Sequence, residues 1–199
     1  MHLCLPYPHT HFIRLTQNRV SGYEESQALT QLAILQQLTT FLGSGKYTGT
    51  LGTPSKIVHI GHSFGSCISN ALIATTPQLS DAAILTGIGY TEVPTSGAFV
   101  EAFGLRIATL QAPGKWPGRD NKYVTWVDAP ANAAAFFQGA SYDEDVLWYT
   151  EAVKQPMAIV ELLTLTILPK ISLEFTKPVV VRTVIYPSIP FLLTWLSCS

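Results

Sequence analysis

Five consecutive residues in the first half of the chain have the types and spacing of a motif that holds a reactive serine. Residues 57–66 read I-V-H-I-G-H-S-F-G-S, and within them Gly61-His62-Ser63-Phe64-Gly65 forms a G-x-S-x-G motif. In such a motif a strand turns sharply into a helix, and the serine at the turn presents its hydroxyl as a nucleophile. Glycines suit the two outer positions, because the end of the strand and the start of the helix nearly touch there.

The sequence on both sides of the motif supplies the expected strand and helix. Ile57, Val58 and Ile60 form an apolar run before it. Apolar residues follow at helical spacing, at Cys67, Ile68, Ala71, Leu72 and Ala74. The alternative is a glycine-rich turn in some other α/β protein, but this context favours the reactive serine. We therefore expect Ser63 on a strained turn with positive φ, between a strand ending near Ile60 and a helix beginning near Phe64.

A serine hydroxyl becomes a good nucleophile only when a base accepts its proton. The chain contains five histidines, which are His2, His9, His11, His59 and His62. None of them follows Ser63. His59 lies within the predicted strand and is better explained as a buried histidine with satisfied hydrogen bonds than as a base. Adjacent positions on such a turn point apart, so His62 is expected to pack or bond locally, and the segment that holds His9 and His11 has no predicted structure.

Composition and charge limit the class of protein. With 199 residues, 47% of them apolar and 13% charged, the chain should form one domain, or one domain with a lid, around a sizeable core. A net charge of -1 provides no attraction for nucleic acid. Cys4, Cys67 and Cys198 are widely separated, which indicates neither a metal site nor a disulfide framework. Free thiols and an N-terminus without a signal-peptide pattern favour a cytoplasmic protein.

The order of predicted elements favours a parallel sheet. Residues 1–20 show no period and are expected to be irregular. A capping box at residues 21–24 precedes an apolar helical stripe over 24–42, which Gly43 ends. Residues 81–87 form a second buried strand after the helix that follows Ser63. Helix, strand, helix and strand in this order predict a doubly wound α/β fold, with a parallel sheet covered on both faces.

The second half of the chain is rich in aromatic residues and divides into two further segments. Residues 93–169 are predicted to form short helices, with a second capping box at residues 141–144 and another apolar helix from Pro156 to Pro169. This pattern suits a lid over a hydrophobic pocket, although core packing is the simpler explanation of any single aromatic residue. Residues 170–199 hold a third strand, at 178–181, and an apolar tail whose last run is too short to span a membrane.

Several stretches resemble serine α/β-hydrolases of the esterase and lipase-like group. They are the capped helix with G-H-S-F-G-S and A-A-I-L-T-G, the cap-like W-V-D-A-P-A-N-A-A-A-F-F and T-E-A-V-K-Q-P, and the late strand F-T-K-P-V-V-V. The resemblance covers roughly residues 24–181. It implies a partial α/β-hydrolase fold, with a parallel sheet core over residues 21–92 and a helical, aromatic-rich lid. It also implies Ser63 as nucleophile, the Phe64 backbone N–H as an oxyanion donor, a small apolar acyl substrate, and neither cofactor nor metal.

The sequence departs from the family pattern at both ends. In this family the turn at Gly61-His62-Ser63-Phe64-Gly65 is called the nucleophile elbow. No early strands precede this elbow to supply the second oxyanion donor, and R-T-V-I-Y-P-S stands where a turn of G-x-x-D form would carry the acid. Asp128, Asp143 and Asp145 are better explained as helix caps or surface charges. We therefore expect the ester-hydrolysing chemistry of the family in a truncated, catalytically incomplete chain.

Two other interpretations remain open. One is a non-catalytic remnant that binds an apolar ligand or a protein partner, and the weaker one is membrane association through the apolar tail. Because the early strands are missing, the strand before Ser63 should lie at an exposed sheet edge. Such an edge offers unpaired backbone groups to a second copy, which predicts self-association.

Overall fold

The computed structural model describes residues 21–88, 104–137, 139 and 141–182. In chain order the helices are α1 (Ala28–Gly43), α2 (Phe64–Thr75), α4 (Ala108–Gln111), α5 (Ala129–Phe136), α6 (Glu144–Val153) and α7 (Ile159–Leu163). The strands are β1 (Val58–His62), β2 (Ala82–Thr86), β3 (Leu105–Ile107), β4 (Tyr123–Trp126), β5 (Met157–Ala158) and β6 (Val179–Arg182). Three short 3₁₀ turns lie at Gly49–Leu51, Pro77–Leu79 and Thr164–Ile167.

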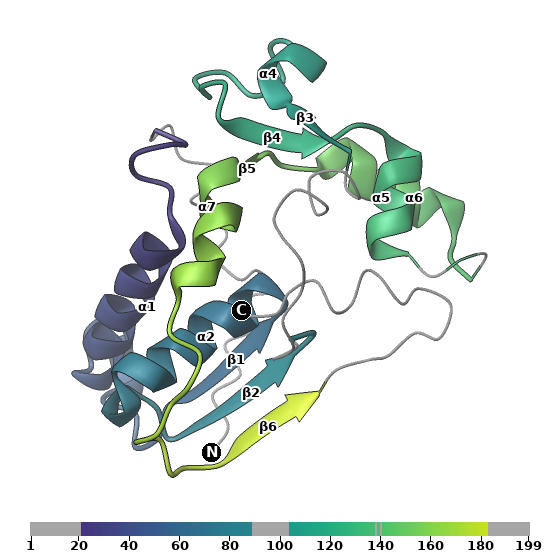
Figure 1. Cartoon of the computed structure of the whole chain (residues 1–199). Helices are drawn as coiled ribbons and strands as arrows, with labels where there is room; N and C mark the ends of the chain where they lie inside the picture. The colour runs from purple at the N-terminus through teal and green to yellow at the C-terminus, as the bar shows by residue number, and fades with distance from the viewer. Residues whose placement is uncertain (1–20, 89–103, 138, 140, 183–199) are drawn as a thin grey trace.

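The first sheet is parallel and has the order β1-β2-β6. Ile84 of β2 pairs with Ile60 on one side and with Val180 on the other. Helices α1 and α2 lie on the same side of this sheet (Figure 1), and their apolar residues share one core with Ala83 and Leu85 of β2. The prediction of three adjacent parallel strands in an α/β arrangement is confirmed.

The opposite face of this sheet exposes apolar side chains. Residues paired across parallel strands point to the same face, so Ile60, Ile84 and Val180 lie together, away from α2. Ile60 is 69% exposed, Val180 56% and Val58 50%. Parallel sheets are normally buried on both faces. The prediction of two covered faces is therefore wrong for the described part of the chain, whereas β1 is an outer strand of this sheet, as expected.

A second sheet lies where a helical lid was predicted. It is antiparallel, with the order β3-β4-β5, and Leu105 of β3 pairs with Trp126 of β4. Helices α4, α5, α6 and α7 belong to the same region, so the expectation of a purely helical lid over residues 93–169 is corrected to a mixed segment. Residues 93–103, 138 and 140 of that range lie outside the described residues. The sequence of β4, Y-V-T-W, is rich in β-branched and aromatic residues, which favour strands.

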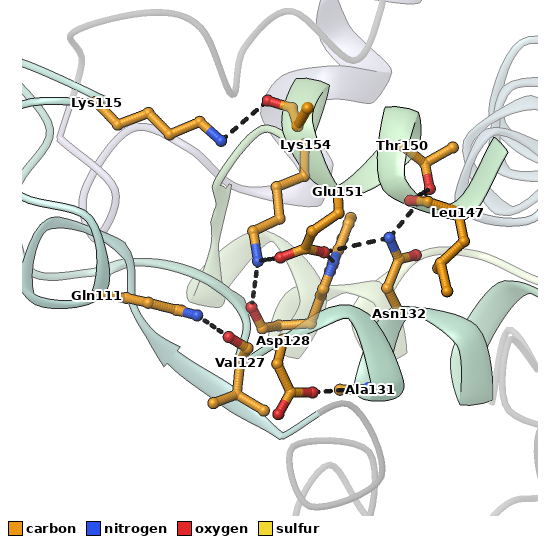
Figure 2. Close-up of polar contacts among 12 residues, drawn as sticks. Gln111, Lys115, Val127, Asp128, Ala131, Asn132, Leu147, Thr150, Glu151 and Lys154 are labelled. Carbon is orange, nitrogen blue, oxygen red and sulfur yellow. Dashed lines mark hydrogen bonds and ion pairs between the residues drawn. The ribbon is translucent and has the colours of Figure 1, made fainter. Parts of the chain in front are cut away.

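A buried ion pair holds α6 against β4 and α5. Lys154 contacts the Glu151 carboxylate and donates to the Trp126 carbonyl at 2.9 Å. The other Glu151 oxygen accepts from Trp126 Nε1 at 2.9 Å and from Asn132 Nδ2 at 3.3 Å. Figure 2 shows Lys154 and Asn132 converging on Glu151 from two sides. A buried ion pair is tolerated when further hydrogen bonds satisfy its members, as they do here.

Polar contacts join the N-terminal part of the described chain to this second segment. The Ser26 hydroxyl lies 3.2 Å from the Tyr123 hydroxyl, and Gly22 N–H donates to Asp120 at 3.0 Å. Gln31 of α1 donates to Glu161 of α7, whose burial raises the pKa of its carboxyl. These specific hydrogen bonds fix the two segments relative to each other.

The starts of two helices differ from their predicted positions. Helix α1 begins at Ala28 rather than at residue 24, and its Ala28 N–H donates to Thr164 Oγ1 at 2.9 Å. Ser21 does accept from the Glu24 N–H, but Glu25 rather than Glu24 returns a bond to the Ser21 N–H, and the motif closes a turn.

Helix α6 is capped by Asp143, whose carboxylate accepts from the Asp145 N–H at 2.8 Å, instead of by the predicted Ser141. Asp128 caps α5 by accepting from the Ala131 N–H at 2.9 Å. The prediction that Asp128 and Asp143 serve as caps is confirmed. Within the described ranges, no helix combines the length and apolar content needed to cross a bilayer. The apolar tail considered from the sequence lies largely outside them, at 183–199.

Candidate functional site

Ser63 lies on a strained turn between β1 and α2. Its backbone has φ 55° and ψ -122°, and α2 begins at the next residue, Phe64. A non-glycine residue in such a conformation costs about 1–3 kcal/mol, which the surrounding structure must supply. Ser63 N–H donates to the Thr86 carbonyl at 2.8 Å, and the Ser63 carbonyl accepts from Ser66 N–H at 2.9 Å. The predicted geometry of the turn is confirmed.

The two glycines of the motif differ in the space that their surroundings leave for a side chain. A Cβ placed on Gly61 would lie 2.6 Å from both the Gly65 carbonyl oxygen and Ser66 Cα, so only glycine fits there. A Cβ placed on Gly65 would meet nothing within 4 Å. The expected close approach of strand and helix is therefore present, but it restricts the side chain at position 61, two residues before Ser63, and leaves position 65, two residues after it, unrestricted.

Thr86, at the end of β2, fixes the turn from the neighbouring strand. Ser66 Oγ donates to the Thr86 carbonyl at 2.8 Å and accepts from Thr86 N–H at 3.0 Å. The Thr86 hydroxyl donates to the Gly61 carbonyl at 3.0 Å. Sequence reasoning missed both residues; the signal available for Thr86 was a polar residue that ends an otherwise apolar strand.

The start of α2 provides the backbone N–H of Phe64, which is one of the two oxyanion donors expected near the Ser63 hydroxyl. Phe64 is the first residue of the helix, and its backbone N–H finds no acceptor among the described residues. The first N–H groups of a helix lack partners within the helix and favour negative charge. The Ser63 side chain is half-buried and likewise makes no hydrogen bond within the described ranges. Hydroxyl and N–H therefore both remain available to a ligand at this turn.

His59 is turned away from Ser63 into the interior. Its Nε2 lies 3.0 Å from Thr39 Oγ1 of α1, and its Nδ1 lies 2.8 Å from Ser80 Oγ, just before β2. Burial lowers the pKa of His59 from 6.5 to about 4. A neutral ring with both nitrogens occupied is a structural residue, which confirms the prediction for His59.

His62 is exposed, and its Nδ1 lies 2.9 Å from the Thr86 hydroxyl. It bonds locally, as predicted. His2, His9 and His11 lie outside the described residues.

None of the hydrogen bonds or ion pairs seen for the described carboxylates involves Ser63. Asp81 precedes β2, at the opposite end of the sheet, where the Ile57 N–H and the Lys56 ammonium lower the pKa of its carboxyl. Glu151 and Glu161 bond within the second segment and to α1. In the described ranges, no carboxylate is seen to bond a histidine, and no group of three or more His, Cys, Asp or Glu side chains could hold a metal.

Two surface cavities lie elsewhere. One of about 340 Å³ is lined by residues of α4, α6 and the turn after α4, including Trp116 and Trp148. The other, of about 370 Å³, lies near Asp81 and the end of α1. Neither is lined by Ser63. The aromatic-rich segment thus does line a cavity, and among the described residues this cavity does not include Ser63.

No protein-family model matches the chain, and no curated protein matches it either. The resemblance to serine hydrolases consequently rests on the motif and on the local geometry of the turn.

The unequal roles of the two glycines can be tested by a matched pair of variants. Gly61→Ala should lower the free energy of unfolding by about 1–3 kcal/mol or more, because its Cβ overlaps backbone that cannot withdraw. Gly65→Ala should raise it by up to about 1 kcal/mol, because alanine stabilises a helix where space is free. Urea denaturation measures both, and equal losses in the two variants would contradict this geometry.

The buried imidazole of His59 predicts a pH dependence of stability. Its pKa falls on folding, so the unfolded chain takes up the proton first as the pH drops. The stabilisation is present above the unfolded value of 6.5 and is lost as the pH falls toward 4, by about 3 kcal/mol. Denaturation at pH 7.5 and pH 4 should show this loss in the wild type and a smaller loss in His59→Gln. Identical losses in both proteins would show that another group is responsible.

Proposed function

We propose that Ser63 occupies the nucleophile position of a serine-hydrolase elbow, whose chemistry is attack on the carbonyl of an ester or related acyl substrate. The observation that carries this proposal is the positive φ of Ser63 at a strand-to-helix junction that only Gly61 permits. The Phe64 N–H beside it supports the proposal, because a backbone donor at that place can stabilise a developing oxyanion. Acyl transfer by a serine requires no cofactor.

The same proposal includes a missing base. His59 has both nitrogens occupied, neither His59 nor His62 is seen to bond the Ser63 hydroxyl, and no histidine follows Ser63 in the 199 residues. Removing triad members leaves a residual acceleration of about a thousandfold to ten-thousandfold over water, which comes from binding and the oxyanion hole. Within the described residues, the Phe64 N–H is the one group seen at the place of an oxyanion donor, and loss of one such donor costs a further factor of about a hundred to a thousand. We therefore place this chain among catalytically incomplete hydrolases, with a small apolar acyl substrate by resemblance.

The serine can be tested directly. The purified chain should hydrolyse short p-nitrophenyl esters no faster than its Ser63→Ala variant, because neither described histidine bonds the Ser63 hydroxyl to accept its proton. It should also remain unlabelled by a fluorophosphonate probe, while an active serine esterase in the same tube is labelled. Ser63-dependent turnover or labelling would show that a base reaches Ser63, and the chain would then be a competent enzyme.

A second candidate function, the binding of a protein partner, is favoured by the open face of the first sheet. Ile60 and Val180 are more than half exposed there, on the outer strands β1 and β6. An apolar face beside a strand edge that pairs with no other described strand is a surface that a second copy of the chain can cover. We propose self-association through this face and edge.

Sedimentation velocity over a range of concentrations tests this second candidate. The wild type should associate as concentration rises, and Ile60→Lys should shift the distribution toward monomer, because a charge on the face cannot be buried without cost. Leu173→Lys is the matched control, since Leu173 is 90% exposed but lies outside the sheet. A wild type that stays monomeric at high concentration, or an Ile60→Lys protein that associates equally, would overturn the proposal.

A further inference from the structure

The imidazole of His62, the residue before Ser63, is held in one orientation by a hydrogen bond at Nδ1. Its Nε2 makes no hydrogen bond to the described residues. The Thr86 hydroxyl donates its single hydrogen to the Gly61 carbonyl, 3.0 Å away. Two oxygens at this distance need a hydrogen between them. The 2.9 Å contact between Thr86 Oγ1 and His62 Nδ1 is therefore made by the ring N–H as donor. This arrangement satisfies all three groups at once, and it leaves the lone pair of the neutral ring on Nε2.

The surroundings of His62 fix the ring but leave it exposed. A Cβ on Gly87, at φ 62°, would lie 3.1 Å from His62 Cε1 and 3.4 Å from Nδ1, so a glycine here makes room for the imidazole. Thr86 is itself fixed by Ser66 through both its N–H and its carbonyl. The His62 side chain is on the open face of the sheet, at the exposed end of β1. A nucleophile that is oriented by a second group and belongs to an exposed residue has the arrangement that covalent catalysis requires.

We infer that His62 Nε2, rather than the Ser63 hydroxyl, is the atom of this elbow that accepts acyl groups from activated esters. The Nε2 lone pair forms a bond to the ester carbonyl carbon, and the bond to the aryl oxygen breaks, so that the phenolate leaves with the electron pair. The positive charge of the acyl-imidazolium is shared through Nδ1–H with Thr86 Oγ1. Water then adds to the acyl carbon and releases the carboxylic acid and a proton, which restores the neutral ring. This inference rests on the proposed function only in placing an acyl substrate at the elbow.

Four proteins separate the two residues: the wild type, Ser63→Ala, His62→Asn and His11→Asn, which is the control for the loss of a histidine elsewhere in the sequence. With p-nitrophenyl acetate, the first two and the control should release nitrophenolate at equal rates. His62→Asn should lose the rate above the buffer background while keeping the wild-type circular dichroism and unfolding transition. A retained rate in His62→Asn, or an equal loss in His11→Asn, overturns the inference. A loss in Ser63→Ala alone would show that Ser63 is the acylated residue, which overturns this inference and the proposed catalytic incompleteness but not the nucleophile position of Ser63.

Thr86 is the positioning residue of this site, and its role has a spectroscopic signature. In the wild type, the ¹⁵N resonances of the His62 ring should show a protonated Nδ1 and an unprotonated Nε2. Thr86→Val keeps the branched shape but removes the acceptor, so the ring should become a mixture of tautomers and the ester rate should fall. A wild-type ring protonated on Nε2 would overturn the inference, and so would an unchanged tautomer and rate in Thr86→Val.

Discussion

The contact of the Gly61 backbone with the first turn of α2 is the constraint on which the core of this protein depends. Because no side chain separates them, the strand and the helix meet at backbone distance, and Ser63 is forced into a left-handed conformation. Such a conformation persists only where neighbours over-determine it. Thr86 provides this support by bonding Gly61, Ser63 and Ser66 from the adjacent strand. The turn, the strand pair and the start of the helix are therefore one structural unit.

The two described histidines show how burial decides the chemistry of a residue type. His59 and His62 lie three positions apart on one strand, yet alternate side-chain directions send one into the core and the other to solvent. In the interior, hydroxyl groups occupy both nitrogens and desolvation keeps the ring neutral. At the surface, one hydroxyl occupies one nitrogen. The histidine in the core is therefore structural, whereas the histidine at the surface keeps one nitrogen for other partners.

Local patterns predicted the parts of the fold that local sequence determines. The turn at Ser63 and the three parallel strands followed from an apolar run, a glycine pattern and a helical stripe. The start of α1 did not follow from local sequence, because the acceptor for its first N–H group, that of Ala28, is the hydroxyl of Thr164, 136 positions away along the chain. The antiparallel sheet was missed because β3, β4 and β5 have only three, four and two residues. The open face escaped prediction because an apolar strand does not reveal which elements will cover it.

The pairing of β2 with β6 has a consequence for how the molecule forms. Ile84 and Val180 are neighbours in the sheet, with about a hundred residues between them along the chain. Closing so long a loop costs conformational entropy before the contacts between the strands can offset that cost, so parallel pairings of this kind form slowly. On a ribosome, β1 and β2 would emerge and pair long before β6 exists. During that interval the outer edge of β2 is available to any other strand, so the competition between folding and aggregation is decided by the order of synthesis.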